Sequence, residues 1–303
     1  MERLPSFFEL SDEVSQALTA GLPLVALESA VITHGLPYPQ NINTAQDMEA
    51  EVRNSGCVPA TIAVLDGRIH VGIDAFQLDR LATEQSLKKI SARDFTTAIA
   101  RGQSGGTTVA GTMLAAGRAG IKVFATGGIG GVHRYPPMDV SADLPQLAGT
   151  RMIVVCAGAK AILDLPATLE YLETHRVPVI GYQTTRFPAF YSRDSGFDVS
   201  AAVESVQQVV TIAKNHWALG LESAILVTVP PPVEAAMLAA DVQKAVDQAL
   251  RDMHAQEIRG QGVTPFLLER VNELTGGASI RANLALLRNN ARVAAEIARA
   301  LSP

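Results

Sequence analysis

Short apolar runs alternate along this chain with longer stretches rich in alanine and leucine. The apolar runs are typical of strands covered on both faces, and the longer stretches show the spacing of amphipathic helices. The predicted strands are 24–27, 61–65, 68–71, 123–126, 152–156, 179–182 and 224–229. The predicted helices are 43–54, 95–101, 109–119, 166–175, 201–218, 233–255, 265–274 and 280–301. This alternation predicts an α/β fold, namely a three-layer α/β/α sandwich around a mixed, largely parallel sheet.

Turn and cap residues mark several boundaries between these elements. The pair Asp66-Gly67 between two predicted strands indicates a tight hairpin. Asn43 is the predicted N-cap of the helix 43–54, with Gln46 at the capping-box position. The prolines at 230–232 end a strand and are a candidate domain boundary, but the helices after them have no further sheet on which to pack. We therefore expect one domain over residues 1–303.

The composition argues against several classes of function. The 303 residues include 25 Lys and Arg against 30 Asp and Glu, a net charge of −5. Binding nucleic acid needs clustered cations, so we expect no nucleic-acid partner, and any anionic ligand must be small. No apolar run approaches the roughly 20 residues that span a bilayer, and the first residues do not resemble a signal peptide. We expect a cytoplasmic protein without a membrane partner, in which Cys57 and Cys156 are buried thiols.

Two candidate catalytic residues follow apolar strands, where ligands bind in open α/β sheets. Glu28 follows the run 24–27, and loss of water there raises the pKa of a carboxyl and suits it to carry a proton. The alternative is a structural glutamate bonded to backbone amides. Lys160 lies just past the run 152–156, where burial favours a neutral amine that attacks carbon and forms a Schiff base. The alternative is a lysine whose stem covers apolar surface while its charge reaches water.

Two glycine-rich segments are candidate anion sites. Residues 105–109 (GGTTV) open a helix with free amides and two hydroxyls, or form an ordinary turn and cap. Residues 126–134 bring four glycines, His133 and Arg134 after a strand. The glycines allow close approach of a ligand and the cations favour an anion. The segment lacks the lysine of a P-loop and the spacing of a dinucleotide motif, so a plain glycine-rich connection is the alternative.

Further polar residues have two interpretations each. Asp139 and Asp143 are four apart, so a helical turn would place both carboxylates on one face. They either share a hard cation such as Mg²⁺ or Mn²⁺, or cap a helix. Lys89 either supplies a cation for a phosphate or lies on a solvated face. Asn283, at the start of an apolar helix, either reaches into the site or caps the helix.

Taken in chain order, these segments resemble the pseudouridine-5'-phosphate glycosidases, which are also called the indigoidine synthase A-like family. The matching stretches are ALESAVITHGLPYPQN from Ala26, SGGTTVAGTM from Ser104, ATGGIGGVHR from Ala125, DVSADLPQLA from Asp139, CAGAKAILDLPATLEYLET from Cys156, and GVTPFLLERVNELTGG and SIRANLALLRNNA near the end. They cover nearly the whole chain. One departure is the link 135–138, which is shorter than the family's usual stretch before the aspartate and puts the path of this loop in question.

The resemblance implies a three-layer α/β/α fold, a homotrimer and one Mn²⁺ per subunit. It implies a lyase with glycosidase activity in pseudouridine catabolism, which reversibly cleaves pseudouridine 5'-phosphate to uracil and ribose 5-phosphate. The family's proton donor falls on Glu28, its nucleophilic lysine on Lys160 and its metal aspartate on Asp139. Its substrate positions fall on Lys89, Val109, Thr126, His133, Ser141, Ala142, Asp143 and Asn283.

The chemistry implied by this resemblance suits the residues. Uracil is joined to ribose through a carbon–carbon bond, so a neutral Lys160 amine at C1' would expel uracil C5 and leave an imine for water to hydrolyse. Glu28 would protonate C5, and Asp143 would assist opening of the ribose ring. Two other hypotheses fit the same residues. One is an aldolase-like Schiff-base enzyme for another sugar phosphate or C-nucleotide, and the other is a non-catalytic sugar-phosphate binding module.

Overall fold

The computed structural model describes residues 4–134, 139–259 and 262–302. Its large sheet has the strand order β1-β4-β3-β2-β7-β9-β13-β11-β12, and β6 joins β5 to β3. The strands are β1 (Phe8–Leu10), β2 (Leu24–Leu27), β3 (Val58–Leu65), β4 (Arg68–Val71), β5 (Lys88–Ile90), β6 (Gly105–Thr107), β7 (Val123–Ala125), β9 (Ile153–Cys156), β11 (Val179–Tyr182), β12 (Ala201–Val203) and β13 (Ile225–Thr228). A separate small sheet pairs β8 (Val132–His133) with β10 (Leu163–Asp164).

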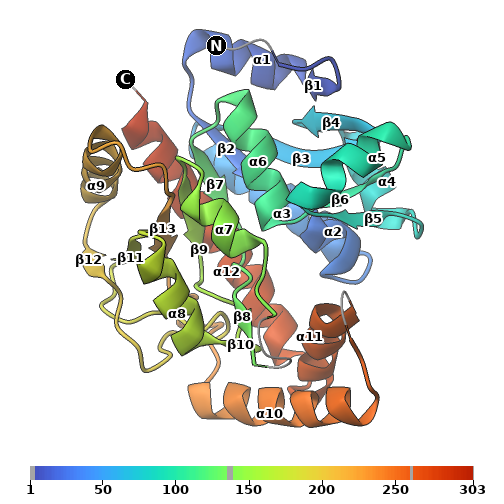
Figure 1. Cartoon of the computed structure of the whole chain (residues 1–303), viewed down its shortest axis with the longest axis vertical. Coiled ribbons are helices and arrows are strands. Elements are labelled where there is room, and N and C mark those ends of the chain that lie inside the picture. Colours follow the sequence, from blue (N-terminus) through green and yellow to red (C-terminus); the bar gives the residue numbers. More distant parts are fainter. Residues whose placement is uncertain (1–3, 135–138, 260–261, 303) are drawn as a thin grey trace.

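Helices flank the sheet on both sides (Figure 1). They are α1 (Asp12–Ala20), α2 (Ala30–His34), α3 (Gln40–Asn54), α4 (Ala75–Thr83), the 3₁₀ turn η1 (Ala92–Asp94), α5 (Phe95–Ala100), α6 (Val109–Ala119), α7 (Asp143–Ala148), α8 (Leu165–Thr174), α9 (Val206–Ala218), α10 (Ala239–Ala255), α11 (Val263–Leu274) and α12 (Ala278–Leu301). Helices α6 and α7 pack together on one side, and α3 and α12 pack together on the other (Figure 1). Among the helices of the described residues, none is both long and apolar enough to cross a membrane.

The predicted fold class is confirmed. Every neighbouring pair of strands in the large sheet is parallel except where β3 meets β4 and β6. All residues of β2, β7, β9 and β13 are buried, which explains why their sequences are apolar without alternation. The hairpin at Asp66-Gly67 is also confirmed, and Cys57 and Cys156 are free, buried thiols as expected. The single domain over 1–303 stays a prediction.

Several boundaries were predicted wrongly. Helix α3 begins at Gln40 rather than at Asn43. The stretch 201–218 contains strand β12 and then α9, because Ser205 accepts a hydrogen bond from the backbone N–H of Gln208 and caps the helix there. The stretch 233–255 becomes helical at Ala239. Residues 105–107, expected to open a helix, form strand β6, and Thr108 caps α6 after it.

The short strands that the sequence analysis missed have a common cause. Strands β1, β5, β6, β8, β10 and β12 have two or three residues each, too few to show any period. Pairing with longer strands defines them instead. Strand β5, for example, is an edge strand next to β6 and carries Lys89.

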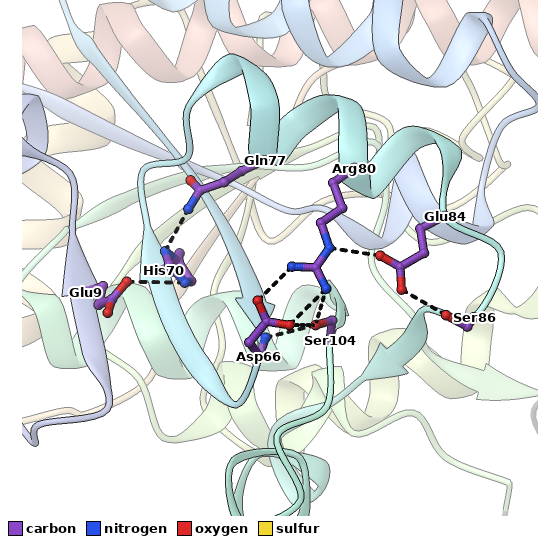
Figure 2. A network of polar contacts seen from close by, with 8 residues as sticks. All are labelled: Glu9, Asp66, His70, Gln77, Arg80, Glu84, Ser86 and Ser104. Atoms are coloured by element: carbon purple, nitrogen blue, oxygen red, sulfur yellow. Dashed lines mark hydrogen bonds and ion pairs between the residues drawn. The ribbon is translucent and has the colours of Figure 1, made fainter.

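A polar network links α4 to the turn between β3 and β4 and to the residue before β6 (Figure 2). Arg80 on α4 donates to both carboxylate oxygens of Asp66 at 2.7 and 2.9 Å, to Glu84 at 2.8 Å and to the Ser104 hydroxyl at 3.2 Å. The Ser104 hydroxyl also accepts from the Asp66 backbone N–H at 2.8 Å. Because Ser104 directly precedes β6, the network fixes the β3–β4 turn and the start of β6 against α4. The guanidinium of Arg80 also holds the pKa of Asp66 below its usual value.

We predict that Arg80→Met lowers the free energy of unfolding by about 1 kcal/mol at low salt, since a partly exposed network of this kind is worth roughly that much. The loss should shrink in 1 M salt, which screens the pairs. It should also shrink as the pH falls through the lowered pKa of Asp66, because the stability from that ionised carboxylate is present only above it. Urea denaturation at two salt concentrations and two pH values measures both effects. A loss that is independent of salt and pH would contradict this prediction.

Candidate active site

The site is built at the carboxyl ends of three neighbouring strands. In the sheet β2, β7 and β9 are parallel, and Leu27, Ala125 and Val155 are in register. The residues that follow these strands therefore leave the sheet at the same edge, and they include Glu28 and Lys160. A cavity of about 440 Å³ opens there. Its lining includes Glu28, Lys89, Val109, His133, Asp139, Ser141, Ala142, Asp143 and Lys160, so the structure brings together most of the predicted site residues.

Glu28 is half-buried and has a specific partner. Its Oε1 atom accepts a hydrogen bond from the hydroxyl of Thr126, the residue at the end of the neighbouring strand. Burial raises the pKa of Glu28 above its usual value, and the positive charge of Lys160 and the Thr126 hydrogen bond reduce that rise. A carboxyl with a raised pKa that lines a cavity is suited to hold and deliver a proton.

Lys160 reaches the cavity from a tight connection after β9. Its backbone N–H donates to the carbonyl of Ile129 at 3.1 Å. Gly158 has a φ of +84°, and a Cβ atom there would lie 2.1 Å from the carbonyl oxygen of Pro188, so the turn requires glycine. Among the described residues, no hydrogen bond or ion pair engages the Lys160 amine. It is half-buried, lines the cavity and is available to a ligand.

Asp143 holds the glycine-rich segment in place. Its Oδ1 atom accepts from the backbone N–H of Ala110 at 2.9 Å, and its Oδ2 atom accepts from that of Gly130 at 2.7 Å. The carboxylate thus joins α7 to the first turn of α6 and to the loop after β7. A Cβ atom on Gly130 would lie 2.2 Å from the Ser141 hydroxyl, so only glycine allows this approach.

The prediction that Asp139 and Asp143 share one face of a helical turn is wrong. Helix α7 begins at Asp143, and Asp139 lies before it in extended backbone whose carbonyl accepts from His133 N–H at 2.8 Å. Asp143 is engaged by backbone amides, whereas Asp139 lines the cavity. The two acids therefore have different surroundings despite their spacing.

Positively charged groups gather on the same cavity. Lys89 from β5, Arg93 and His133 line it together with Lys160. Burial lowers the pKa of Lys89, and the nearby charge of Lys160 lowers it further. Burial also lowers the pKa of His133. An anionic ligand would relieve the repulsion between these cations, which favours an anion such as a phosphate in this cavity.

The residues present fit a divalent cation held by few protein ligands. Within the described residues no group of three or more His, Cys, Asp or Glu side chains is arranged to hold a metal. Asp139 is half-buried and lines the cavity beside the cation-rich end. Mg²⁺-like ions in phosphate sites are commonly bound by one or two carboxylates, with water and substrate oxygens completing the shell. Asp139 can supply the single carboxylate that such a site needs.

Three residues singled out in the sequence analysis are absent from the lining of the larger cavity. Thr126 is wholly buried behind Glu28 and is absent from the cavity lining, so it does not face a ligand there. Asn283 lies in the second turn of α12 and lines a smaller adjoining cavity of about 70 Å³ together with Glu28, Lys89 and Lys160. Arg134 donates to the carbonyl of Leu163 at 3.1 Å, and it is not a lining residue. The link 135–138 lies outside the described residues.

The sequence analysis missed several lining residues. Ser91, Arg93, Asp94 and Thr264 also face the cavity. Ser91, Arg93 and Asp94 follow the short strand β5, which no periodicity revealed. Thr264 comes from α11 and reaches the site through long-range packing, for which a single sequence carries no signal.

Fold and site together define an α/β enzyme with a small, cation-rich cavity at the ends of parallel strands. Residues 13–300 match the family model described as "Indigoidine synthase A like protein". A pseudouridine-5'-phosphate glycosidase of Geobacillus kaustophilus is 50% identical over 98% of this chain and 99% of its own length. Another from Caldanaerobacter subterraneus is 51% identical over 96% of both chains. The chain therefore belongs to the indigoidine synthase A-like family.

Two solved structures share the whole fold. The prealnumycin C-glycosynthase AlnA, solved in complex with ribulose 5-phosphate, superposes with a TM-score of 0.91 at 40% identity and covers 98% of both chains. An indigoidine synthase A-like protein of Thermotoga maritima superposes with a TM-score of 0.89 at 34% identity, again over 98% of both chains.

We predict that Asp143→Asn lowers the free energy of unfolding by about 2 kcal/mol, because the amide –NH₂ would face a buried backbone N–H and leave it unpaired. Asp139→Asn is the matched control and should change stability by less than about 0.5 kcal/mol. Thermal and urea unfolding of both variants measures the difference. Equal stability of the two variants would contradict the anchoring role of Asp143.

Proposed function

We propose that this protein is a pseudouridine-5'-phosphate glycosidase, which reversibly cleaves pseudouridine 5'-phosphate to uracil and ribose 5-phosphate. The observation that carries the proposal is that the Lys160 amine and the Glu28 carboxyl line one cavity. Relatives of that name are about half identical over nearly the full chain. The cation-rich wall suits the phosphate, and the cavity volume of about 440 Å³ suits a nucleotide.

The first step opens the ribose ring. Lys160 first gives up its ammonium proton to solvent. The lone pair of the resulting neutral amine forms a bond to C1', the bond from C1' to the ring oxygen breaks, and that oxygen takes up a proton. The nitrogen loses a proton in the same step, so charge is balanced. The product is an open-chain adduct in which a secondary amine joins Lys160 to C1'.

The second step breaks the carbon–carbon bond. Glu28 delivers its proton to uracil C5, which makes the ring an electron acceptor. The nitrogen lone pair then forms a C=N bond as the bond from C1' to C5 breaks, and its electrons return to uracil. Water adds to the resulting imine at C1', which releases ribose 5-phosphate and restores the lysine. Glu28 regains its proton from the solvent.

The other residues bind and orient the substrate. Lys89, His133 and the backbone near Val109 hold the phosphate end, and Ser141, Ala142 and Asn283 contact the remainder. Asp143 holds the loop that carries Gly130, which its two backbone hydrogen bonds favour over a direct part in ring opening. Thr126 acts on Glu28 instead of on the substrate. The homotrimer and the cytoplasmic location are further parts of this proposal, carried by the family resemblance.

Asp139 would hold one Mn²⁺ per subunit, with water and substrate oxygens as the other ligands. When bound, such an ion polarises and orients the oxygens that coordinate it. The proton that reaches uracil comes from Glu28 and the nucleophile is Lys160, so neither role falls on the ion.

A second candidate function is favoured by one comparison. The solved relative AlnA is a C-glycosynthase, so proteins with this fold join carbon to a sugar on other substrates. This chain would then form or break a carbon–carbon bond between a sugar phosphate and a different aromatic ring. Relative kcat/KM on pseudouridine 5'-phosphate and on other C-linked sugar phosphates distinguishes the two functions.

We predict that sodium borohydride with ribose 5-phosphate inactivates the enzyme and adds the reduced sugar phosphate to the Lys160 peptide. Reduction traps the imine, which the proposed mechanism forms on Lys160, whereas Lys89 in the same cavity holds the phosphate end. Peptide mass spectrometry locates the adduct. Lys160→Arg should not be labelled and should lose at least about 10³-fold in kcat, while Lys122→Arg, an exposed lysine away from the cavity, should behave as wild type. Full activity in Lys160→Arg would refute the mechanism.

We predict that removal of divalent cations with a chelator abolishes uracil release, and that added Mn²⁺ restores it in the wild type. Asp139→Asn should require at least about tenfold more Mn²⁺, because it loses the carboxylate proposed as the metal ligand. Absorbance of uracil against pseudouridine 5'-phosphate follows the reaction. An unchanged Mn²⁺ requirement in Asp139→Asn would show that the metal, if used, binds elsewhere.

A further inference from the structure

Asn290 is a polar residue inside the apolar face of α12. Its side chain is wholly buried, and its neighbours along the helix include the buried residues Leu286, Leu287 and Ala294. The amide Nδ2 donates to the carbonyl of Thr126 at 2.8 Å and to that of Gly127 at 3.4 Å. Within the described structure its Oδ1 atom has no hydrogen-bond partner. A buried, unpaired oxygen costs stability, so the core alone gives no reason for an asparagine here.

The two carbonyls that Asn290 holds belong to the segment beside Glu28. The Thr126 backbone N–H donates to the carbonyl of Val155 on β9 at 3.0 Å, and the Thr126 carbonyl accepts from Asn290. Both backbone polar atoms of Thr126 are therefore fixed, one by the sheet and one by α12. This fixes the direction of the Thr126 hydroxyl, which donates to Glu28 Oε1.

We propose that Asn290 is a positioning residue of the active site, which acts on the Glu28 carboxyl through Thr126. The inference rests on the proposed function, in which Glu28 protonates uracil C5. Oε1 accepts the Thr126 hydrogen bond, and the carbonyl oxygen of a protonated carboxyl is a better acceptor than its hydroxyl oxygen, so this contact favours the acidic proton on the other oxygen, Oε2. Asn290 thus favours one oxygen as the carrier of the proton, although it is remote in sequence from Glu28 and does not itself line either cavity.

The charged groups that act on Glu28 come from three other places. They are Lys160 after β9, Lys89 on β5 and Asp143 at the start of α7. None of these side chains hydrogen-bonds to Asn290 or Thr126 in the described part of the chain. A change at position 290 therefore reaches Glu28 through Thr126, and Thr126→Val removes the same link directly.

The test compares Asn290→Leu, which has the same number of side-chain heavy atoms but lacks the N–H donor, with Thr126→Val and with their double variant. Asn289→Ala, the neighbouring asparagine on the same helix, is the matched control because it bonds to Arg292 and not to Thr126. Carbon-13 NMR titration of the Glu28 carboxyl gives its pKa without any turnover. The Thr126 hydrogen bond lowers that pKa, so Thr126→Val and Asn290→Leu should both raise it. The double variant should raise it no further than Thr126→Val does, and Asn289→Ala should leave it unchanged.

Steady-state kinetics on pseudouridine 5'-phosphate provide the second readout. Asn290→Leu should lower kcat by about 10- to 100-fold, the cost of misplacing a catalytic group, with KM within about twofold of wild type. If Asn290→Leu does not fold, Asn290→Ala is measured in its place. An unchanged Glu28 titration in a folded variant, or an effect that adds fully to that of Thr126→Val, would overturn the inference. If the wild type releases no uracil, the proposed function fails, while the NMR titration still decides whether Asn290 acts on Glu28.

Discussion

The parallel pairing of β2, β7 and β9 is the constraint on which the rest of the site depends. Because Leu27, Ala125 and Val155 are in register, the strands end at one edge of the sheet, and Glu28 and Thr126 leave that edge side by side. The connection after β9 then brings Lys160 to the same cavity. Burial of all three strands on both faces makes this register costly to change, since a shift by one residue would move each side chain to the opposite face.

Repulsion between the cations that line the cavity, and burial of a carboxyl beside them, both oppose its stability. Other contacts must therefore hold the loops around the cavity in place. Here backbone hydrogen bonds do so. Asp143 binds the amides of Ala110 and Gly130, and Asn290 binds the carbonyls of Thr126 and Gly127. These buried contacts fix the loops around the site without engaging the Lys160 amine, which leaves that amine free for a ligand and its positive charge close enough to moderate the pKa of Glu28.

Sequence analysis predicted the site residues whose charge contrasts with the apolar residues before them in the chain. A glutamate and a lysine directly beyond apolar strands are conspicuous, and both lie in the cavity. The spacing of Asp139 and Asp143 led to the wrong prediction of one shared helical face. Helix α7 begins at the second aspartate, and the first lies before it. Thr126 and Asn290 carried no local signal of their actual contacts, since a chain gives no indication of which strand a helix 164 residues away will touch. Short strands such as β5 and β6 were missed because pairing, and not periodicity, defines them.

The central claim is that one cavity holds the Lys160 amine and the Glu28 carboxyl on either side of the sugar carbon that reacts. A crystal structure of the protein with ribose 5-phosphate tests it most directly. The account predicts continuous density from Lys160 Nζ to the sugar's C1 atom, with Glu28 within reach of the position where uracil would lie and the phosphate near Lys89. A sugar phosphate bound in another cavity, or a Lys160 amine directed into solvent, would contradict the account.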